Sequence, residues 1–338
     1  MTDELRERFF WTRALALVAV TSAGFLTIVG SGGGGGSVGF PPCPPSVCVP
    51  APPPAASAVI TPAYVTAQVG TSPSWSVTSS NITGAVTYLW RRSSDGGATY
   101  AVIAGATASS YTLAGVNLAD DGALIEADVV HSGEVVSAVS RLLVSATPGI
   151  VFEDTEFAAA DWVVTPLLDA THTVFAPVTE QVASGGNPGA YRKMTFTIEP
   201  LELDERAIFV SQAFTYDPAA QGAIRVIDYA EDCRALQDSS VESTQSSLVI
   251  EQAGRHYGAD QYGLCVQTSW APVANRASLV AADFHRFDGP ACGTGESCPD
   301  FSAAGAPMRF GYFRIVFGTQ GNVIAHGIDN WKVTVWRQ

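Results

Sequence analysis

The stretch GIDNWKVTVW, residues 327–336 near the C-terminus, decides the fold class of this chain. From Trp331 onward its side chains alternate, and Trp331, Val333 and Val335 share one side. Successive side chains of a strand point to opposite faces of a sheet, so a period of two predicts a half-buried strand. We expect this strand to close a large β-domain, with those three residues in its core.

The composition extends this expectation to the whole protein. With 338 residues the chain suits two domains plus tails. It is 47% hydrophobic but only 15% charged, below the average of about 25% for soluble domains. This mixture predicts an all-β exported protein. The net charge of −14 repels phosphate backbones, which excludes nucleic acid as a partner, although acidity also serves solubility.

The N-terminus has the layout of a secretory signal. Three arginines (Arg6, Arg8 and Arg13) precede an apolar run over residues 14–30. The run and the glycines after it resemble bacterial lipoprotein signals, but Ser31 stands where the lipidated cysteine would be, and a hydroxyl cannot form the thioether. Residues 1–30 are therefore a cleaved signal or an anchor that contacts the membrane. We expect the protein at the cell surface, in the periplasm or outside the cell. Residues 31–57, rich in glycine and proline, are a predicted linker.

The cysteine count favours disulfides. The chain has six cysteines, an even number in an exported protein: Cys43, Cys48, Cys233, Cys265, Cys292 and Cys298. Close spacing favours the pairs Cys43–Cys48 and Cys292–Cys298, which leaves Cys233–Cys265. A zinc site is the alternative, but the sequence has no CxxC pair and no clustered histidines.

Residues 58–146 contain short alternating runs with turn residues every eight to twelve positions, the rhythm of a β-sandwich. The segments VTYLWRRSSDGG (86–97), ATASSYTL (106–113) and ADDGAL (119–124) resemble a bacterial immunoglobulin-like domain. The resemblance makes Trp90 the core tryptophan of the third strand. It places Val77 and Ala127 where a disulfide would sit and Ile125 in place of the corner tyrosine.

Residues 150–338 contain seven further strand-like runs and no long amphipathic helix, apart from a turn expected around Glu231–Leu236. About 190 residues of strands and loops fit a jelly roll. The acidic-aromatic opening from Phe152 to Trp162, the turn GGNPGAYR (185–192), the run FGYFR (310–314) and the closing DNW resemble the concanavalin A-like lectin and glucanase group. The resemblance implies that first and last strands pair, which brings Trp162 near Trp331. The expected fold is an immunoglobulin-like sandwich followed by a larger jelly roll.

The catalytic pattern of such glucanases is incomplete here. They use two glutamates in the pattern Glu-x-Asp-x-x-Glu, and the nearest match, VIDYAE (226–231), begins with a valine. We therefore expect Asp228, Glu231 and Asp232 to form a solvated face, or else acceptors for sugar hydroxyls. No hydrolase, metalloprotease or nucleotide motif is present. Folding could still bring His256 and His285 together with Asp283, so enzyme activity stays open.

Sugar binding needs flat aromatic faces together with polar groups for the hydroxyls. The segments RHYGADQY (255–262) and Trp270 with Asn275-Arg276 supply both kinds of group, and YR (191–192) and DFHRFD (283–288) are further candidates. The predicted ligand contacts are Tyr191, Arg192, Tyr257, Tyr262, Trp270 and Arg286. The alternative is that these aromatics are core residues, the commoner role of aromatics in β-domains.

A structural calcium ion is a further hypothesis. Glu153, Asp154 and Asp329 would supply its oxygen ligands at the seam of the first and last strands. The alternative is that Asp329-Asn330 only makes a turn before the final strand. No other cofactor is predicted.

These observations favour an exported, non-catalytic protein whose partner is a glycan or another cell-surface component. Two other functions remain: a glycan-processing enzyme with an unrecognised carboxylate site, and a purely structural envelope protein with every aromatic buried.

Overall fold

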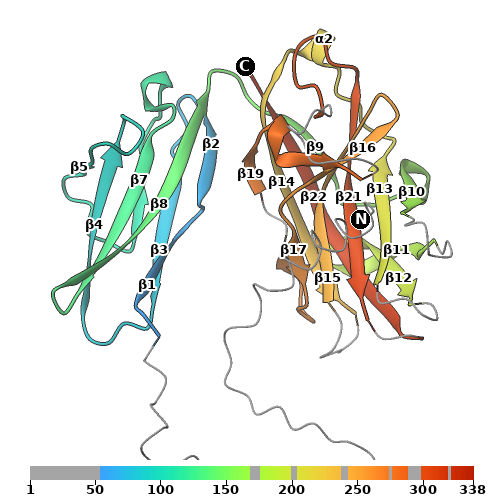
Figure 1. Ribbon diagram of the computed structural model, residues 1–338, viewed down its shortest axis with the longest axis horizontal. Helices are drawn as coiled ribbons and strands as arrows, with labels where there is room; N and C mark the ends of the chain where they lie inside the picture. Colours follow the sequence, from blue (N-terminus) through green and yellow to red (C-terminus); the bar gives the residue numbers. More distant parts are fainter. Residues whose placement is uncertain are drawn as a thin grey trace, which may run out of the picture. The chain divides into compact units, whose positions relative to one another are not determined.

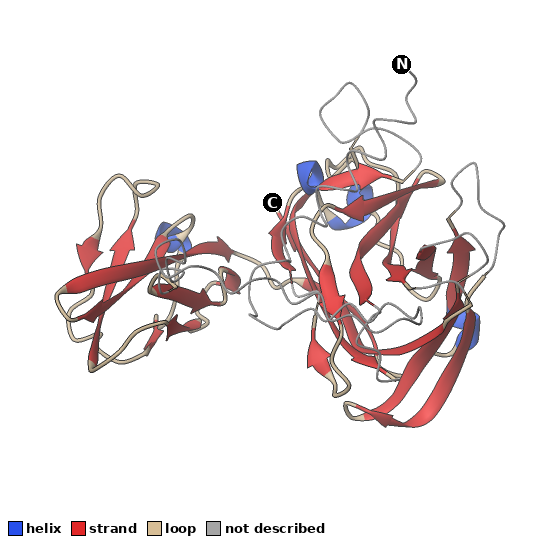
Figure 2. Ribbon diagram, turned by 60° about the horizontal axis from the view of Figure 1, so that its bottom comes forward, coloured by secondary structure: helices blue, strands red, loops and turns tan. Residues whose placement is uncertain are grey.

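The computed structural model describes residues 54–167, 176–198, 204–236, 243–273, 276–287, 298–318 and 321–338. These residues are mostly strands, with α2 (Pro218–Gln221) as a short helix (Figure 2). The predicted all-β class is confirmed. The predicted signal 1–30, nearly all of the predicted linker 31–57, and Cys43, Cys48 and Cys292 lie outside the described residues. Among the described helices, none is long and apolar enough to cross a membrane.

The strands from Ser57 to Ser145 form an immunoglobulin-like sandwich (Figure 1). One sheet has the order β1-β3-β6 and the other the order β2-β8-β7-β4-β5, which matches the ABE and GFC layout of that sandwich. The bounds are β1 (Ser57–Thr61), β2 (Tyr64–Gln68), β3 (Ser74–Ser80), β4 (Val86–Ser93), β5 (Ala101–Val102), β6 (Ser110–Thr112), β7 (Leu124–His131) and β8 (Glu134–Ser145).

The core of this first sandwich is centred on Trp90, which is completely buried. Its backbone position on β4 lies opposite Ala127 on β7, and its indole Nε1 donates to the carbonyl of Ala108 at 2.8 Å. Val77 and Ile125 are buried in the same cluster. Apolar packing therefore occupies the region where the resemblance would place a disulfide.

The strands from Ile150 to Arg337 form the larger jelly-roll sandwich of two seven-stranded sheets. The β22 sheet has the order β11-β12-β22-β14-β18, with β9 on β22 and β19 on β14. The β21 sheet has the order β10-β13-β21-β15-β16-β20, with β17 on β15. The bounds are β9 (Ile150–Asp154), β10 (Trp162–Pro166), β11 (Val178–Gly186), β12 (Gly189–Thr197), β13 (Asp204–Ser211), β14 (Ile224–Ala235), β15 (Ser243–Gln252), β16 (Arg255–Ala259), β17 (Gly263–Cys265), β18 (Ala271–Pro272), β19 (Arg276–Leu279), β20 (Phe284–Arg286), β21 (Met308–Phe317) and β22 (Val323–Arg337).

The closing strand β22 holds its sheet together. Its first half pairs with β12, its second half pairs with β9, and β14 runs along both halves. The first and last strands of the sandwich therefore pair, and the rings of Trp162 and Trp331 meet edge to face at 5.1 Å. Trp331, Val333 and Val335 are fully buried, so the predicted alternation is confirmed.

A bulge interrupts β22 at Asn330, which has a positive φ of 50°. On the paired strands, Ala230 lies opposite Lys332 but Asp232 lies opposite Asp329, so β22 carries an extra residue there. Because of that residue, both Ile328 and Trp331 face the core.

The structure corrects one local prediction. Residues 231–235 continue β14 instead of forming a turn. Tyr229, Glu231 and Cys233 are buried along one side of this strand, and Asp232 and Arg234 lie on the other.

Candidate functional site

A polar cluster surrounds the bulge on the outer face of the β22 sheet. The Asp232 carboxylate accepts hydrogen bonds from the side-chain amides of Asn187, at 2.9 Å, and Asn330, at 2.7 Å. The Asn330 amide also donates to the carbonyl of Asn187 at 2.6 Å. Asn187 is at the tip of the β11–β12 hairpin, so this network joins that turn to β22 and β14.

Asp329 lies beneath this cluster and is buried. Its carboxylate accepts hydrogen bonds from the backbone N–H groups of Asn187 and of Asn330, the latter at 2.7 Å. Burial raises the pKa of Asp329, and the neighbouring charges of Asp232 and Glu156 act in the same direction, while the two N–H donors oppose the rise. A Cβ at Gly186 would stand 2.5 Å from the Asp329 carboxylate, so a glycine is needed there.

Trp270 lies across the same face of the sheet. Its indole Nε1 donates to the carbonyl of Gly185 at 2.8 Å, and its ring meets Tyr191 edge to face at 5.2 Å. The ring passes over Gly327, where a Cβ would come within 2.7 Å of the indole and 2.9 Å of the tyrosine ring. Tyr191 is almost covered, whereas Trp270 stays partly exposed.

Arg234 completes the surface. It lies directly opposite Gly327 across the β14–β22 pairing, and its Nε donates to the carbonyl of Thr268 at 3.0 Å. Aromatic faces, amides, a carboxylate and a guanidinium thus gather on one side of the sheet. We call these residues the Trp270 surface: Asn187, Tyr191, Asp232, Arg234, Trp270 and Asn330.

Only two of the six predicted ligand contacts, Tyr191 and Trp270, belong to this surface. Arg192, the neighbour of Tyr191, points into the core, where it is 3% exposed and its guanidinium lies over the rings of Trp162 and Phe209. Period-two alternation on β12 explains the difference between neighbours. Arg192 is therefore corrected from a ligand contact to a core residue.

Of the other three predicted contacts, Tyr257 on β16 and Arg286 on β20 lie in the β21 sheet, and Tyr262 lies in the connection between β16 and β17. Tyr257 is 3% exposed and belongs to the main core, so it is corrected from a ligand contact to a core residue. Tyr262 packs against Phe313 with ring centroids 6.1 Å apart, and burial raises the pKa of its hydroxyl. Arg286 lies opposite Tyr257 in the β16–β20 pairing and is partly buried.

The predicted calcium ligands do not fit a metal site. Asp154 accepts hydrogen bonds from the backbone N–H groups of Glu156 and Phe157 and from the Trp162 indole, at 2.7–2.8 Å, so its carboxylate organises the turn after β9. Glu153 is exposed. Within the described ranges, no group of three or more His, Cys, Asp or Glu side chains could hold a metal ion. The calcium prediction from Glu153, Asp154 and Asp329 is corrected accordingly.

Cys233 on β14 and Cys265 on β17 form a disulfide that joins the two sheets. Cys298 is also disulfide-bonded.

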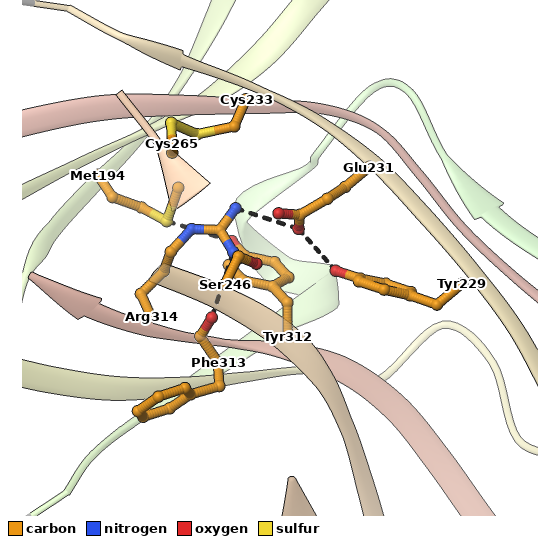
Figure 3. A network of polar contacts seen from close by, with 9 residues as sticks. All are labelled: Met194, Tyr229, Glu231, Cys233, Ser246, Cys265, Tyr312, Phe313 and Arg314. Atoms are coloured by element: carbon orange, nitrogen blue, oxygen red, sulfur yellow. Dashed lines mark hydrogen bonds and ion pairs between the residues drawn. A yellow bond between two sulfur atoms is a disulfide. The ribbon is translucent and has the colours of Figure 1, made fainter. Parts of the chain in front are cut away.

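The predicted solvated face of Asp228, Glu231 and Asp232 is wrong for Glu231. This residue points into the sandwich, where its carboxylate accepts hydrogen bonds from the Tyr229 hydroxyl at 2.6 Å and from Arg314 at 3.1 Å (Figure 3). The Glu231 and Arg314 side chains are both fully buried. Asp228 lies on the opposite face and accepts from the Trp336 indole at 2.7 Å. The two carboxylates therefore cannot act on a common bond.

The buried network includes further polar groups. Arg314 also donates to Ser246, and its guanidinium lies 4.7 Å from the centre of the Tyr312 ring. Burial raises the pKa of Tyr229 well above its usual range, and the charge of Glu231 adds to this. Burial lowers the pKa of His326 well below its usual range, with the charge of Arg314 contributing. Tyr229 and His326 are therefore uncharged near neutral pH, and both are buried.

His256 and His285 lie on the neighbouring strands β16 and β20. His285 pairs with Asp260, with 2.6 Å between its Nδ1 and the carboxylate. Asp283 instead accepts a hydrogen bond from the backbone N–H of Val280 at 2.8 Å.

Sequence reasoning missed Asn187, Arg234 and Asn330 as members of the site. The alternation along β14 is a signal that could have placed Arg234 beside Asp232. The asparagines are adjacent only because the bulge and the hairpin turn meet, and no local pattern encodes that meeting.

Comparison with known proteins adds little to this description. No family model matches the chain, and no curated protein matches it either. A structure of a family 30 carbohydrate-binding module aligns with 8% identity and a TM-score of 0.31, over 55% of this chain and 99% of that one. The first four immunoglobulin domains of Dscam1 isoform 4.44 align with 23% identity and a TM-score of 0.22, over 27% of this chain.

The first eight immunoglobulin domains of Down syndrome cell adhesion molecule align with 12% identity and a TM-score of 0.22, over 82% of this chain. The chain spans 21% of the Dscam1 structure and 50% of this one. All three TM-scores are low, so the fold assignment rests on the strand pairing of the chain itself.

Proposed function

We propose that the second sandwich binds carbohydrate through the Trp270 surface. The observation that carries this proposal is the partly exposed indole of Trp270 beside Asp232 and Arg234. An aromatic face stacks on the C–H groups of a sugar ring, while carboxylate, guanidinium and amide groups bind its hydroxyls. One surface of this protein supplies every one of these groups.

The small size of a monosaccharide implies that single sugars bind weakly. Ligands gain about 0.3 kcal/mol per heavy atom, so a monosaccharide of about twelve atoms gains about 4 kcal/mol, which corresponds to a Kd of about 1 mM. A polymeric glycan that presents many copies of the same sugar raises the effective affinity. We therefore expect a polysaccharide or surface glycan as the physiological partner.

A glycan array probed with the full chain tests the proposal. Trp270→Ala should lose binding to every glycan that the parent retains. Tyr64→Ala is the matched control, because Tyr64 is 50% exposed on the first sandwich and lies outside the Trp270 surface. Equal retention by Trp270→Ala and the parent, or no retention by the parent at all, would contradict the proposal.

The chain organisation that we propose places this surface outside the inner membrane. Residues 1–30 act as signal or anchor, 31–57 as linker, 58–146 as an immunoglobulin-like spacer, and 150–338 as a concanavalin A-like binding domain. The Cys233–Cys265 disulfide supports an oxidising compartment. Fractionation of cells, with N-terminal sequencing of the mature protein, tests the location, and limited proteolysis near residues 146–150 tests the division.

A further inference from the structure

We propose that the Cys233–Cys265 disulfide is the positioning element of the Trp270 surface, so that carbohydrate binding depends on this bond although no sugar touches it. The inference rests on the proposed function, because it concerns the same surface. It assigns a role in ligand binding to two residues that a ligand cannot reach.

The segment from Cys265 to Ala271 is a closed loop attached at both ends to one residue. Cys265 is bonded to Cys233, with 5.7 Å between their Cα atoms, and Ala271 lies directly opposite Cys233 in the β14–β18 pairing. Trp270 immediately precedes Ala271. The backbone of Trp270 is thus held by a short loop whose two ends meet on β14, while its indole also contacts Gly185 and Tyr191.

Between these ends the loop has few other anchors. Val266 is 51% exposed, and Gln267, Thr268 and Ser269 are exposed as well. The remaining attachments are hydrogen bonds: the carbonyl of Gln267 accepts from the N–H of Ala235 at 2.7 Å, that of Thr268 accepts from Arg234 at 3.0 Å, and the Trp270 indole donates to the carbonyl of Gly185 at 2.8 Å. Cys265, at 3% exposed, is the buried side chain of this segment.

The disulfide also fixes where the loop crosses from one sheet to the other. Cys265 ends β17, which pairs with β15 in the β21 sheet, and the chain then reaches β18 in the β22 sheet. Residues 266–269 are exposed and bury little apolar surface against the sandwich. Without the disulfide at the crossing, little hydrophobic contact would therefore keep the loop in place.

The two faces of β14 separate positioning from contact. Cys233 points into the sandwich beside the buried Glu231–Arg314 network, as Figure 3 shows, and is fully buried. Its neighbours Asp232 and Arg234 point to the outer face. A sugar on the outer face therefore cannot reach the sulfur atoms, and any effect of the disulfide on affinity must act through the loop.

The expected effect follows from the fraction of molecules with Trp270 in place. The apparent Kd is the intrinsic Kd divided by the fraction of the competent state. A loop that holds the indole over Gly327 in about a tenth of molecules weakens binding about tenfold.

The test compares the parent full chain with Cys233→Ala/Cys265→Ala and with a control that is destabilised elsewhere. Val249→Ala is that control, since Val249 is fully buried in the separate cluster on the outer side of the β21 sheet. The probes are neutral linear hexasaccharides of glucose, xylose and mannose, titrated by calorimetry. Acrylamide quenching of Trp270, obtained by difference against Trp270→Phe in each background, reports the position of the indole.

We expect the cysteine variant to bind at least tenfold more weakly and to show a more accessible Trp270, while Val249→Ala keeps the parental affinity and quenching. A folded cysteine variant with parental affinity and parental quenching would overturn the proposal. A Gly-Gly insertion after Thr268 loosens the loop but keeps both cysteines, and it should weaken binding equally. If this insertion binds as the parent does, the proposal fails even where the cysteine variant does not fold.

Failure of the proposed function has a different outcome. A parent that binds none of the probes, and no glycan on the array, contradicts carbohydrate binding at this surface. The quenching measurements then still decide whether the disulfide positions Trp270: unchanged quenching in both loop variants refutes it, and increased quenching supports it.

Discussion

Breaking the buried pair of Glu231 and Arg314 should destabilise the second sandwich far more than replacing both partners. Glu231→Gln leaves a guanidinium in the core without a counter-charge, in a place where both side chains are fully buried. Removal of one partner from such a pair costs about 3–5 kcal/mol of the free energy of unfolding. That is a large part of the roughly 5–15 kcal/mol that stabilises a typical domain.

The double replacement Glu231→Leu/Arg314→Met should be close to neutral. It removes both charges at once and fills the space with apolar groups, and well-packed apolar replacements of buried ion pairs are often neutral or stabilising. The Tyr229 hydroxyl, which donates to Glu231 at 2.6 Å, then loses its acceptor, which costs about 1–3 kcal/mol. We therefore expect the double variant to lie within about 3 kcal/mol of the parent.

Urea unfolding followed by tryptophan fluorescence measures these values, and hydrogen exchange in β21 assigns the transition to the second sandwich. The control is Lys193→Met, which breaks an ion pair of 2.7 Å at the surface, between the partly exposed Lys193 and the exposed Glu180. An exposed pair contributes about 0–1 kcal/mol. If Glu231→Gln costs no more than Lys193→Met, the pair is not desolvated as described and the reasoning is refuted.

Two further predictions concern the Trp270 surface. Gly327→Ala places a Cβ 2.7 Å from the indole of Trp270, so it should displace the ring, cost about 1–3 kcal/mol of stability and weaken glycan binding. Gly254→Ala is the control: its Cβ has no neighbour within 4 Å, and its φ of +71° strains an alanine, so it should lower stability but leave binding unchanged. Calorimetric titration distinguishes the two variants. Burial raises the pKa of Asp329, so the folded state binds the proton of this carboxyl group more tightly than the unfolded chain does. The contribution of Asp329 to stability therefore falls as the pH rises from the ordinary carboxyl pKa through the raised pKa of the folded state. Asp329→Asn should flatten that part of the curve of unfolding free energy against pH, and an unchanged curve would contradict the assignment.

Much of the strand content could be predicted because it depends on local alternation. Trp331, Val333 and Val335 are buried as their period of two required. The pairing of β9 with β22, expected from the resemblance, also occurs. The strand boundaries were less predictable. β14 continues to Ala235 because Glu231 and Cys233 both face inward and extend its alternating pattern. The sequence did not indicate this, because a carboxylate is not expected at a core-facing position of a strand.

The site was only partly predictable, and the reason is physical. Tyr191 and Trp270 were identified by residue type, since aromatic rings beside glycine and polar residues suit sugar binding. Tyr257 is also an aromatic residue beside glycine and polar residues, and Arg192 is the polar neighbour of Tyr191, yet both are core residues. Residue type states what chemistry a side chain offers, while the face of the strand decides whether a ligand can reach it.

The sequence by itself determined the all-β class, the two sandwiches in their order along the chain, and the alternating core of the closing strand, because each depends on neighbours in the chain. Only the tertiary structure decided that Glu231 is buried with Arg314 and that Trp270 lies over Gly327 beside Asp232 and Arg234. Those relations join residues from different strands, across a bulge and a disulfide. Their geometry depends on register and loop closure, which side-chain periodicity does not specify.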